Sequence, residues 1–163
     1  MPSPFSSLSD FAALLRAAPG TDAAATQAAQ ARDADLTKPP GALGRLEDLA
    51  QWYCGWRSDA RARVTAPQVI VFAGNHGVVA QGISAFPAAV TAQMVANFRA
   101  GGAAVNQLAA QVGARMDVVA LDLDRPTGDI SLGPAMSEDD MLRALNAGWD
   151  AVEAERREAA PAL

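Results

Sequence analysis

The residues best placed to do chemistry lie in the segment 69–78, where an apolar, β-branched run breaks into Gly-Asn-His-Gly at 74–77. His76 is the only histidine of the chain. In open α/β sheets, ligands bind in the crevice beyond the carboxyl ends of the strands. Glycines on both sides let the backbone approach a ligand closely. The segment therefore predicts a ligand site in which Asn75 and His76 present the polar groups.

Two interpretations of His76 are open at this point. A lone histidine at a strand end can be a structural, hydrogen-bonded residue, or it can orient a ligand. Nothing in the sequence pairs it with a nucleophile. We therefore identify no catalytic residue in this chain.

The segment that follows, 82–98, combines apolar and hydrogen-bonding side chains. Phe86 offers a flat apolar face and Met94 an adaptable wall, with Ser84 and Gln93 as possible hydrogen-bonding groups. Phe86 and Met94 could equally be core residues, because aromatic and methionine side chains at helical spacing often pack inward. Both interpretations stay open.

Other polar residues are weaker candidates. Lys38, which precedes two prolines, could bind a phosphate or be a solvated loop lysine. Asp122, Asp124 and Asp129 lack the spacing of a calcium loop, so we expect no metal site. Cys54 is the only cysteine, and it has no partner for an internal disulfide or a metal site.

The bulk composition narrows the class of protein. The 163 residues, 50% apolar and 19% charged, are enough for one domain with a core. The net charge of −5 argues against a nucleic-acid partner. No run of about 18 apolar residues could span a membrane, and the start has no secretory signal pattern. We expect a cytoplasmic protein with small-molecule ligands.

The elements that must position these residues follow from hydrophobic periodicity. A helical segment is expected over 1–66 and an α/β segment over 67–152, and the tail 153–163 is expected to fray. The helical segment should hold helices over 6–18, 22–34 and 43–56. The α/β segment should hold strands over 68–73 and 116–121, with helices between and after them. Ser137 should cap the last helix.

Apolar residues at helical spacing indicate which faces pack inward. One face of the helix over 43–56 carries Leu43, Leu46, Leu49, Ala50 and Tyr53. Leu108 and Val112 are expected to point inward, as are Met141, Leu142, Leu145, Trp149 and Val152 in the last helix. Two strands separated by helices predict a parallel pair. Parallel sheets usually have more strands, so the chain looks like the opening half of a larger unit, or a piece completed by oligomerisation.

Three segments together resemble the nicotinate-nucleotide–dimethylbenzimidazole phosphoribosyltransferase family. The first is Leu-Thr-Lys-Pro-Pro-Gly-Ala-Leu-Gly-Arg-Leu-Glu at 36–47, and the third is Gly-Pro-Ala-Met-Ser at 133–137. The second joins Phe-Ala-Gly-Asn-His-Gly-Val at 72–78, Gly-Ile-Ser-Ala-Phe-Pro at 82–87 and Val-Thr-Ala-Gln-Met-Val-Ala-Asn-Phe at 90–98. The resemblance runs from about Leu36 to Val152 and looks like the family's N-terminal half.

The resemblance implies a function in making the lower ligand of cobalamin. The family moves a phosphoribosyl group from nicotinate mononucleotide to 5,6-dimethylbenzimidazole, giving α-ribazole 5′-phosphate and nicotinate. It implies a homodimer without a cofactor. The substrate-binding residues it implies are Asn75, His76, Ser84, Phe86, Gln93 and Met94. The family's catalytic glutamate and Gly-rich phosphate loop lie in its C-terminal half, so we expect the isolated chain to be inactive.

The resemblance also implies an α/β fold, a Rossmann-like parallel sheet flanked by helices, with the N-terminal helices in a small helical subdomain. A second class of function remains open beside the enzyme. The chain could be a non-catalytic α/β module for oligomerisation or for binding an aromatic ligand.

Overall fold

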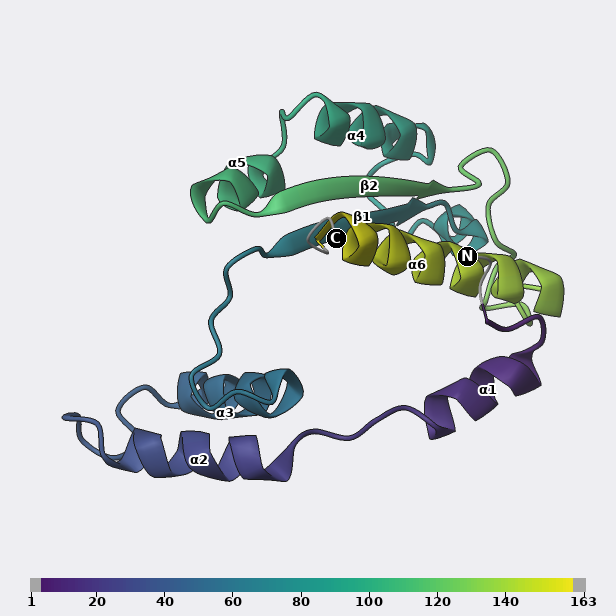
Figure 1. Ribbon diagram of the computed structural model, residues 1–163. Coiled ribbons are helices and arrows are strands. Elements are labelled where there is room, and N and C mark those ends of the chain that lie inside the picture. Colours follow the sequence, from purple (N-terminus) through teal and green to yellow (C-terminus); the bar gives the residue numbers. More distant parts are fainter. Residues whose placement is uncertain (1–3, 160–163) are drawn as a thin grey trace. The chain divides into compact units, whose positions relative to one another are not determined.

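A computed structural model describes residues 4–159, and the chain divides into two compact units (Figure 1). The α/β unit comprises the residues up to Leu14 and those from Ala66 on, and the helical unit comprises Leu15–Thr65. The division falls beside the expected boundary at residue 66. The residues before Leu15 group with the α/β unit instead of the helical segment, because the ring of Phe5 packs edge-on against Trp149 with 6.0 Å between centroids.

The α/β unit is built on two parallel strands, β1 (Gln68–Gly74) and β2 (Arg115–Leu121). They pair in register, from Gln68 opposite Arg115 to Gly74 opposite Leu121. The run of β-branched and aromatic residues in β1 favours an extended chain. Parallel strands need a crossover connection, so the predicted parallel pair with intervening helices is confirmed.

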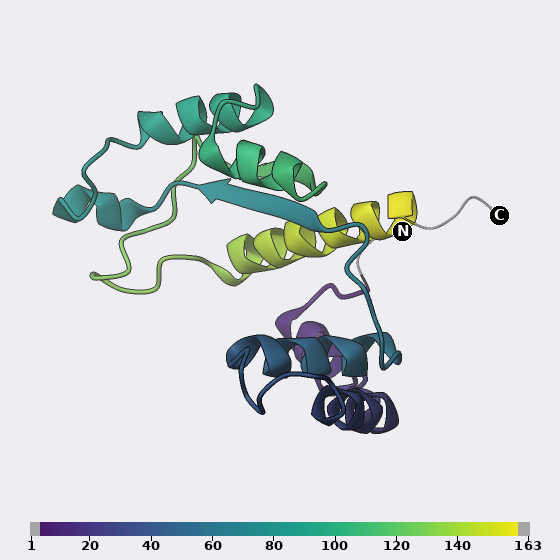
Figure 2. The same ribbon diagram turned by 90° about the vertical axis from the view of Figure 1, so that its left-hand side faces the viewer.

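Helices cover the strand pair on both sides. The connection holds a short 3₁₀ turn, η1 (Gly77–Gln81), then α4 (Ala89–Arg99) and α5 (Ala104–Gln111). After β2 comes α6 (Glu138–Ala159). Figures 1 and 2 show α4 and α5 on one face of the strands and α6 on the other. This is the predicted α/β architecture, and η1 is the element that periodicity did not predict.

The core of this unit is smaller than the sequence pattern predicts. Val95 of α4 and Ala109 of α5 are buried. Leu108 and Val112, predicted to point inward, are exposed, and so are Met141 and Val152 of α6. Those predictions are wrong for this chain, because two strands offer faces too narrow to cover the full apolar stripe of each helix.

Helix α6 begins as predicted and ends later. Ser137 accepts a hydrogen bond from the Asp140 backbone N–H at 3.1 Å, while its own N–H donates to the Asp140 carboxylate at 3.1 Å. This reciprocal cap satisfies donors at the helix start. The helix continues through 153–159, where fraying was expected. An ion pair of 2.6 Å between Arg115 of β2 and Glu155 holds that part to the sheet; residues 160–163 lie outside the described part.

At the start of the chain, α1 (Leu8–Arg16) follows Phe5. The rings of Phe5 and Phe11 lie 4.8 Å apart between centroids. None of the helices within residues 4–159 combines the length and the apolar character needed to cross a membrane.

The helical unit packs through small side chains. Its helices are α2 (Ala23–Ala34) and α3 (Arg45–Arg57), and Ala25 and Ala29 of the first are buried together with Cys54 and Gly55 of the second. A Cβ at Gly55 would overlap Thr26 Oγ1 of α2. Close packing therefore explains the Ala-rich composition of α2, because larger residues would separate the helices.

The leucine-bearing face of α3 is uncovered in this chain. Leu46 and Leu49 are each more than half exposed, as is Leu43 just before the helix. Trp52 is also more than half exposed, and its ring packs edge-on against Trp56. The periodicity of the sequence identified the leucine-bearing face of this helix. The face of α3 that is buried is a different one, and it is formed by small residues.

Lys38 holds the connection between α2 and α3. Its Nζ lies 2.7 Å from Glu47 Oε1 and 3.2 Å from the Asp33 carboxylate. The hydrogen bond with Glu47 raises the pKa of Lys38 above its usual 10.5, and the same bond holds the pKa of Glu47 below its usual 4.5. Glu47 also accepts a hydrogen bond from the Leu43 backbone N–H at 3.1 Å. The Lys38 ammonium group thus links α2 to α3.

We predict that Glu47→Gln lowers the thermal midpoint of the chain at neutral pH, since the neutral amide leaves Lys38 with one carboxylate partner. The contribution of Glu47 is fully present above pH 4.5 and is lost as the pH falls through its lowered folded pKa. The contribution of Lys38 is present below pH 10.5 and is lost as the pH rises through its raised folded pKa.

The check is thermal unfolding by circular dichroism at pH 7 and at stepwise lower pH. Asp150→Asn, at an exposed acid of α6, serves as the control for simple loss of a charge. An equal midpoint for the Glu47→Gln variant and the wild type at pH 7 would contradict the role of this ion pair.

Candidate functional site

The candidate site lies where the loops after β1 and β2 run side by side at the carboxyl ends of the strands. The Gly77 N–H donates to Thr127 O at 2.9 Å, and the Thr127 N–H donates to Asn75 O at 3.1 Å. His76 and Thr127 thereby form a short parallel bridge beyond the sheet. The pairing fixes the backbone of the Gly-Asn-His-Gly turn, as expected of a ligand site at a strand end.

Gly77 is the point of closest approach between the two loops. A Cβ at this position would lie 2.6 Å from Thr127 O and 2.7 Å from the Gly128 carbonyl carbon. Contacts that short are not tolerated, so only glycine lets the loops pair here. The structural requirement at Gly77 is therefore steric.

Asn75 and His76 serve the turn in different ways. The Asn75 side-chain amide donates to Leu123 O at 2.8 Å and is half-buried, so it clamps one loop to the other. His76 is exposed, with its Nδ1 3.3 Å from Thr127 Oγ1. A neutral hydroxyl orients the ring and does not polarise it as a carboxylate would. This geometry suits an orienting role better than that of a general base.

A second clamp joins the same loops at Gln81 and Asp129. Gln81 Nε2 donates to Asp129 Oδ2 at 2.6 Å, and Ser131 donates to Oδ1 from both its N–H at 2.9 Å and its hydroxyl at 2.7 Å. These hydrogen bonds, that of Gln81 first, hold the pKa of Asp129 below its usual 3.8. Asp129 thus fixes the loop after β2 to η1.

Ser84 and Phe86 form the next turn. The Ser84 hydroxyl donates to Phe86 O at 2.9 Å and accepts from the Phe86 N–H at 3.2 Å. The Phe86 side chain is 67% exposed, so in this chain it is a surface aromatic and the core interpretation is wrong. The hydroxyl of Ser84 shapes the turn that presents the ring.

Gln93 and Met94 lie on α4, both exposed beside the buried Val95. The loop after β2 adds further exposed apolar side chains, which are Ile130, Leu132 and Met136. The loops and α4 therefore expose apolar and hydrogen-bonding groups, and the loop after β2 also exposes Asp122 and Asp124. Such a surface suits a flat, uncharged, aromatic ligand.

The structure does not place every candidate in these loops. Lys38 belongs to the helical unit, where it already pairs with two carboxylates. Its binding of a phosphate stays a prediction. The residues that sequence reasoning missed are Gln81 and Thr127, because their partners are 48 and 51 residues away along the chain.

Known proteins resemble the chain over most of its length. A family model described as phosphoribosyltransferase matches residues 18–163. A nicotinate-nucleotide–dimethylbenzimidazole phosphoribosyltransferase of Ruegeria pomeroyi is 68% identical over 146 residues, which are 90% of this chain and 44% of that protein. The Cereibacter sphaeroides protein of the same name is 61% identical over 155 residues, 95% of this chain and 46% of its own.

Solved structures agree with these relatives. The crystal structure of the protein with that name from Thermus thermophilus matches with a TM-score of 0.77 at 35% identity, over 85% of this chain and 47% of that one. The chain thus spans about half the length of the proteins it matches.

We predict that Gly77→Ala destabilises the chain by about 1–3 kcal/mol, the usual cost of forcing extra volume into a packed place. Gly148→Ala in α6 is the matched control, because a Cβ there meets nothing within 4 Å and alanine favours a helix by about 0.5–1 kcal/mol. Urea unfolding measures both. Equal stability of Gly77→Ala and the wild type would show that the loops do not pair this closely.

Proposed function

The chain belongs to the nicotinate-nucleotide–dimethylbenzimidazole phosphoribosyltransferase family, and from that premise we propose that it contributes to phosphoribosyl transfer from nicotinate mononucleotide to 5,6-dimethylbenzimidazole. The products are α-ribazole 5′-phosphate and nicotinate. The observation that carries the proposal is the fixed Gly-Asn-His-Gly turn at the strand ends, followed by an aromatic ring held out into solvent. The contribution of this chain is the benzimidazole-binding surface.

In this proposal Phe86 stacks on the bicyclic ring and Met94 adapts to its edge. His76 and Gln93 are the exposed polar groups that can hydrogen-bond to the azole nitrogens. Asn75 and Ser84 bind indirectly, because their side chains already hold the loops in shape.

The chemistry is a substitution at the ribose carbon. A benzimidazole nitrogen forms the new carbon–nitrogen bond, and the bond to nicotinate breaks with its electron pair passing to the pyridine nitrogen. That step neutralises a pyridinium, so the leaving group needs little acid assistance. The remaining requirement is a base for the benzimidazole N–H proton.

Asp129 and Asp140 are poorly suited to be that base. Hydrogen bonds with Gln81 and Ser131 hold the pKa of Asp129 low, and those with Ser137 do the same for Asp140. A general base works best with a pKa near the working pH. The base must therefore come from outside this set of side chains.

The alternative is a non-catalytic module that binds an aromatic ligand or oligomerises. The exposed apolar side chains of the loops and of α3 favour it for the 163 residues taken alone. Both functions require the same surface for binding an aromatic ligand, so a binding measurement tests that surface and does not distinguish them. An activity assay distinguishes the enzyme from the non-catalytic module.

We predict that 5,6-dimethylbenzimidazole binds the chain more tightly than nicotinate mononucleotide does, with a dissociation constant of about 1 mM. Phe86→Ala should weaken binding roughly two- to tenfold, since a stacked aromatic pair contributes about 0.5–1.5 kcal/mol. Asn75→Ala should weaken it less, because that amide faces Leu123 O.

Ligand-observed NMR measures these affinities. Trp52→Ala, which removes an exposed aromatic ring from the helical unit, is the control and should bind as the wild type does. Equal binding by the wild type and the Phe86→Ala variant would place the benzimidazole surface elsewhere.

We also predict that the 163 residues alone release no nicotinate from the two substrates. The physical reason is that Asp129 and Asp140 do not suit the role of the base, and the loss of a general base typically costs about 10²–10⁴-fold in rate. The full-length Ruegeria pomeroyi relative serves as the positive control in the same assay. Turnover proportional to the amount of purified chain would overturn the prediction and would rule out the module.

A homodimer in the cytoplasm is part of the same proposal. A sheet of two strands has unpaired edges, and such edges can pair with another chain. Contiguous exposed apolar side chains also favour association. A phosphorylated mononucleotide is charged and stays inside the cell, where this substrate would be found. Light scattering should give a mass above that of one chain at high protein concentration, and a mass of one chain throughout would contradict it.

A further inference from the structure

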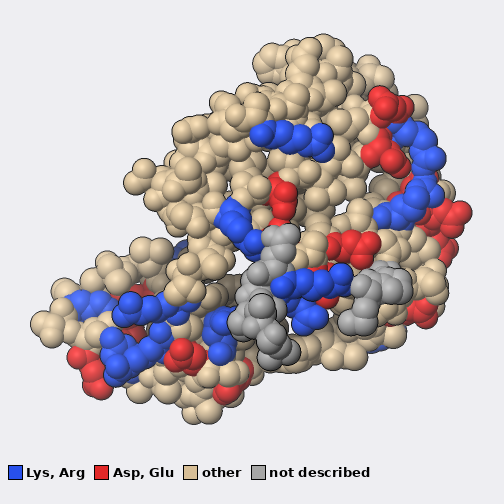
Figure 3. Space-filling view, turned by 45° about the horizontal axis from the view of Figure 1, so that its top comes forward, with Lys and Arg blue, Asp and Glu red and all other residues tan. Residues whose placement is uncertain are grey.

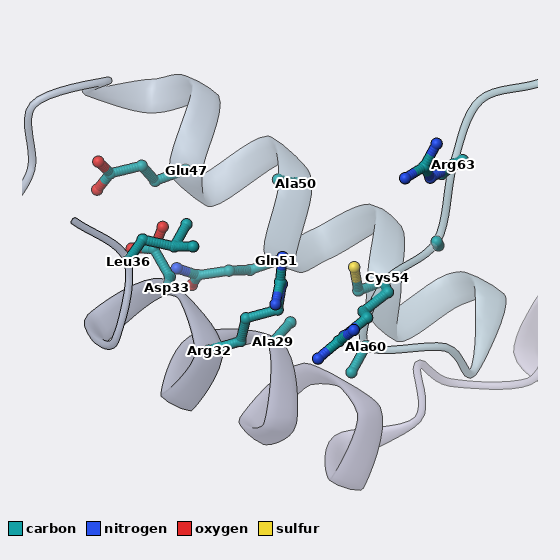
Figure 4. A pocket seen from close by; sticks show the side chains of 12 residues that line it. Ala29, Arg32, Asp33, Leu36, Glu47, Ala50, Gln51, Cys54, Ala60 and Arg63 are labelled. Carbon is teal, nitrogen blue, oxygen red and sulfur yellow. The ribbon is translucent and has the colours of Figure 1, made fainter. Parts of the chain in front are cut away.

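The helical unit contains a cavity of about 350 Å³ that the proposed function does not use. It lies between α2, α3 and the segment 60–63. Figure 4 shows Arg32 reaching from α2 toward Gln51 of α3, with Cys54 farther along α3. Arg61 and Arg63 complete the basic part of the lining. A smaller neighbouring cavity shares these two arginines and adds Arg57.

The arginines of this cavity have no anionic partner. Within residues 4–159, the guanidinium groups of Arg32, Arg61 and Arg63 make no hydrogen bond or ion pair. The two carboxylates in the lining, Asp33 and Glu47, are both bound by Lys38. Positive charge is therefore in excess around the hollow.

The charge of the helical unit differs from that of the chain as a whole. Leu15–Thr65 carries seven Lys or Arg residues and six Asp or Glu residues, whereas the complete chain carries 13 and 18. In the space-filling view, Lys and Arg side chains lie among Asp and Glu side chains at the lower left (Figure 3). Uncompensated charge of one sign in a concave place attracts ions of the opposite sign.

We propose that this cavity binds a small phosphate monoester through Arg32, Arg61 and Arg63. A guanidinium presents parallel N–H donors that match two oxygens of a phosphate. The volume lies at the lower end of the range for small-molecule sites, and it exceeds what a bare anion fills. Gln51 can hydrogen-bond to the organic part, while Ala29 and Ala50 give it apolar contact.

The single cysteine supplies a built-in reporter for occupancy. Cys54 lines the cavity and is 7% exposed, and no other thiol exists in the sequence. A bound ester would cover this side chain. Alkylation of Cys54 by iodoacetamide should therefore slow when the cavity is filled.

The test uses the 163-residue chain with ribose 5-phosphate and inorganic phosphate as probes. Isotope-labelled protein is titrated by NMR, following the arginine side-chain N–H signals, and Cys54 alkylation is timed in parallel. We expect saturable shifts, a tighter dissociation constant for the ester than for inorganic phosphate, and slower alkylation at saturation. The double variant Arg61→Gln/Arg63→Gln should weaken ester binding at least tenfold.

The control is Arg45→Gln, at an exposed arginine of the same unit that lines neither of the two cavities. It should bind the ester as the wild type does. Arg61 and Arg63 are themselves exposed, so their replacement leaves the small-residue packing of α2 and α3 intact. Arg32→Gln tests the third guanidinium separately.

Three results would overturn the proposal. The first is the absence of saturable shifts with either probe, and the second is equal weakening in the control and the double variant, which would indicate diffuse charge attraction. The third is equal affinity for the ester and inorganic phosphate, which would show that the cavity does not accept the organic part. None of these depends on benzimidazole binding, so failure here and failure of the proposed function are distinguishable.

Discussion

The in-register parallel pairing of β1 with β2 is the interaction on which the candidate site depends. Because Gly74 ends one strand opposite Leu121 at the end of the other, the chain leaves both strands at the same edge. The bridge between His76 and Thr127 continues this pairing into the loops, and Gly77 permits the close approach. A change of register by one residue would move every one of these contacts. The geometry of the Gly-Asn-His-Gly turn is therefore determined more by the pairing of the backbone than by the side chains of the turn.

Two strands and two packed helices also set how much surface this chain can bury. The buried side chains are mostly small, such as Ala29, Cys54 and Ala109, while larger ones such as Leu46, Leu108 and Phe86 remain exposed. Burying an apolar side chain of that size contributes about 1.5–3 kcal/mol to the free energy of unfolding. The exposed side chains do not make this contribution in the chain alone. Burying them against further protein surface or against an apolar ligand would therefore be favourable.

The sequence predicts the local elements well, because periodicity and Gly or Pro breaks act over short distances. The strand over 68–73 and the cap at Ser137 are examples. It does not predict what depends on register between distant segments. Gln81 meets Asp129 across 48 residues, and Arg115 extends α6 by pairing with Glu155 across 40. The buried face of α3 was missed for a related reason, since which face packs depends on the partner helix.

The two units differ in net charge, and this difference favours a different kind of ligand in each. The α/β unit carries 12 of the 18 acidic residues, and its loops hold Asn75, His76 and Phe86, for which we propose a role in binding benzimidazole. A dianion gains little there and is repelled by the surrounding carboxylates, whereas a neutral aromatic ring is indifferent to them. The cavity lined by Arg32, Arg61 and Arg63 favours an anion, because these three exposed guanidinium groups carry positive charge that the carboxylates of the lining do not neutralise. We therefore expect ligand preference in this chain to depend on where its arginines lie as much as on the shape of either surface.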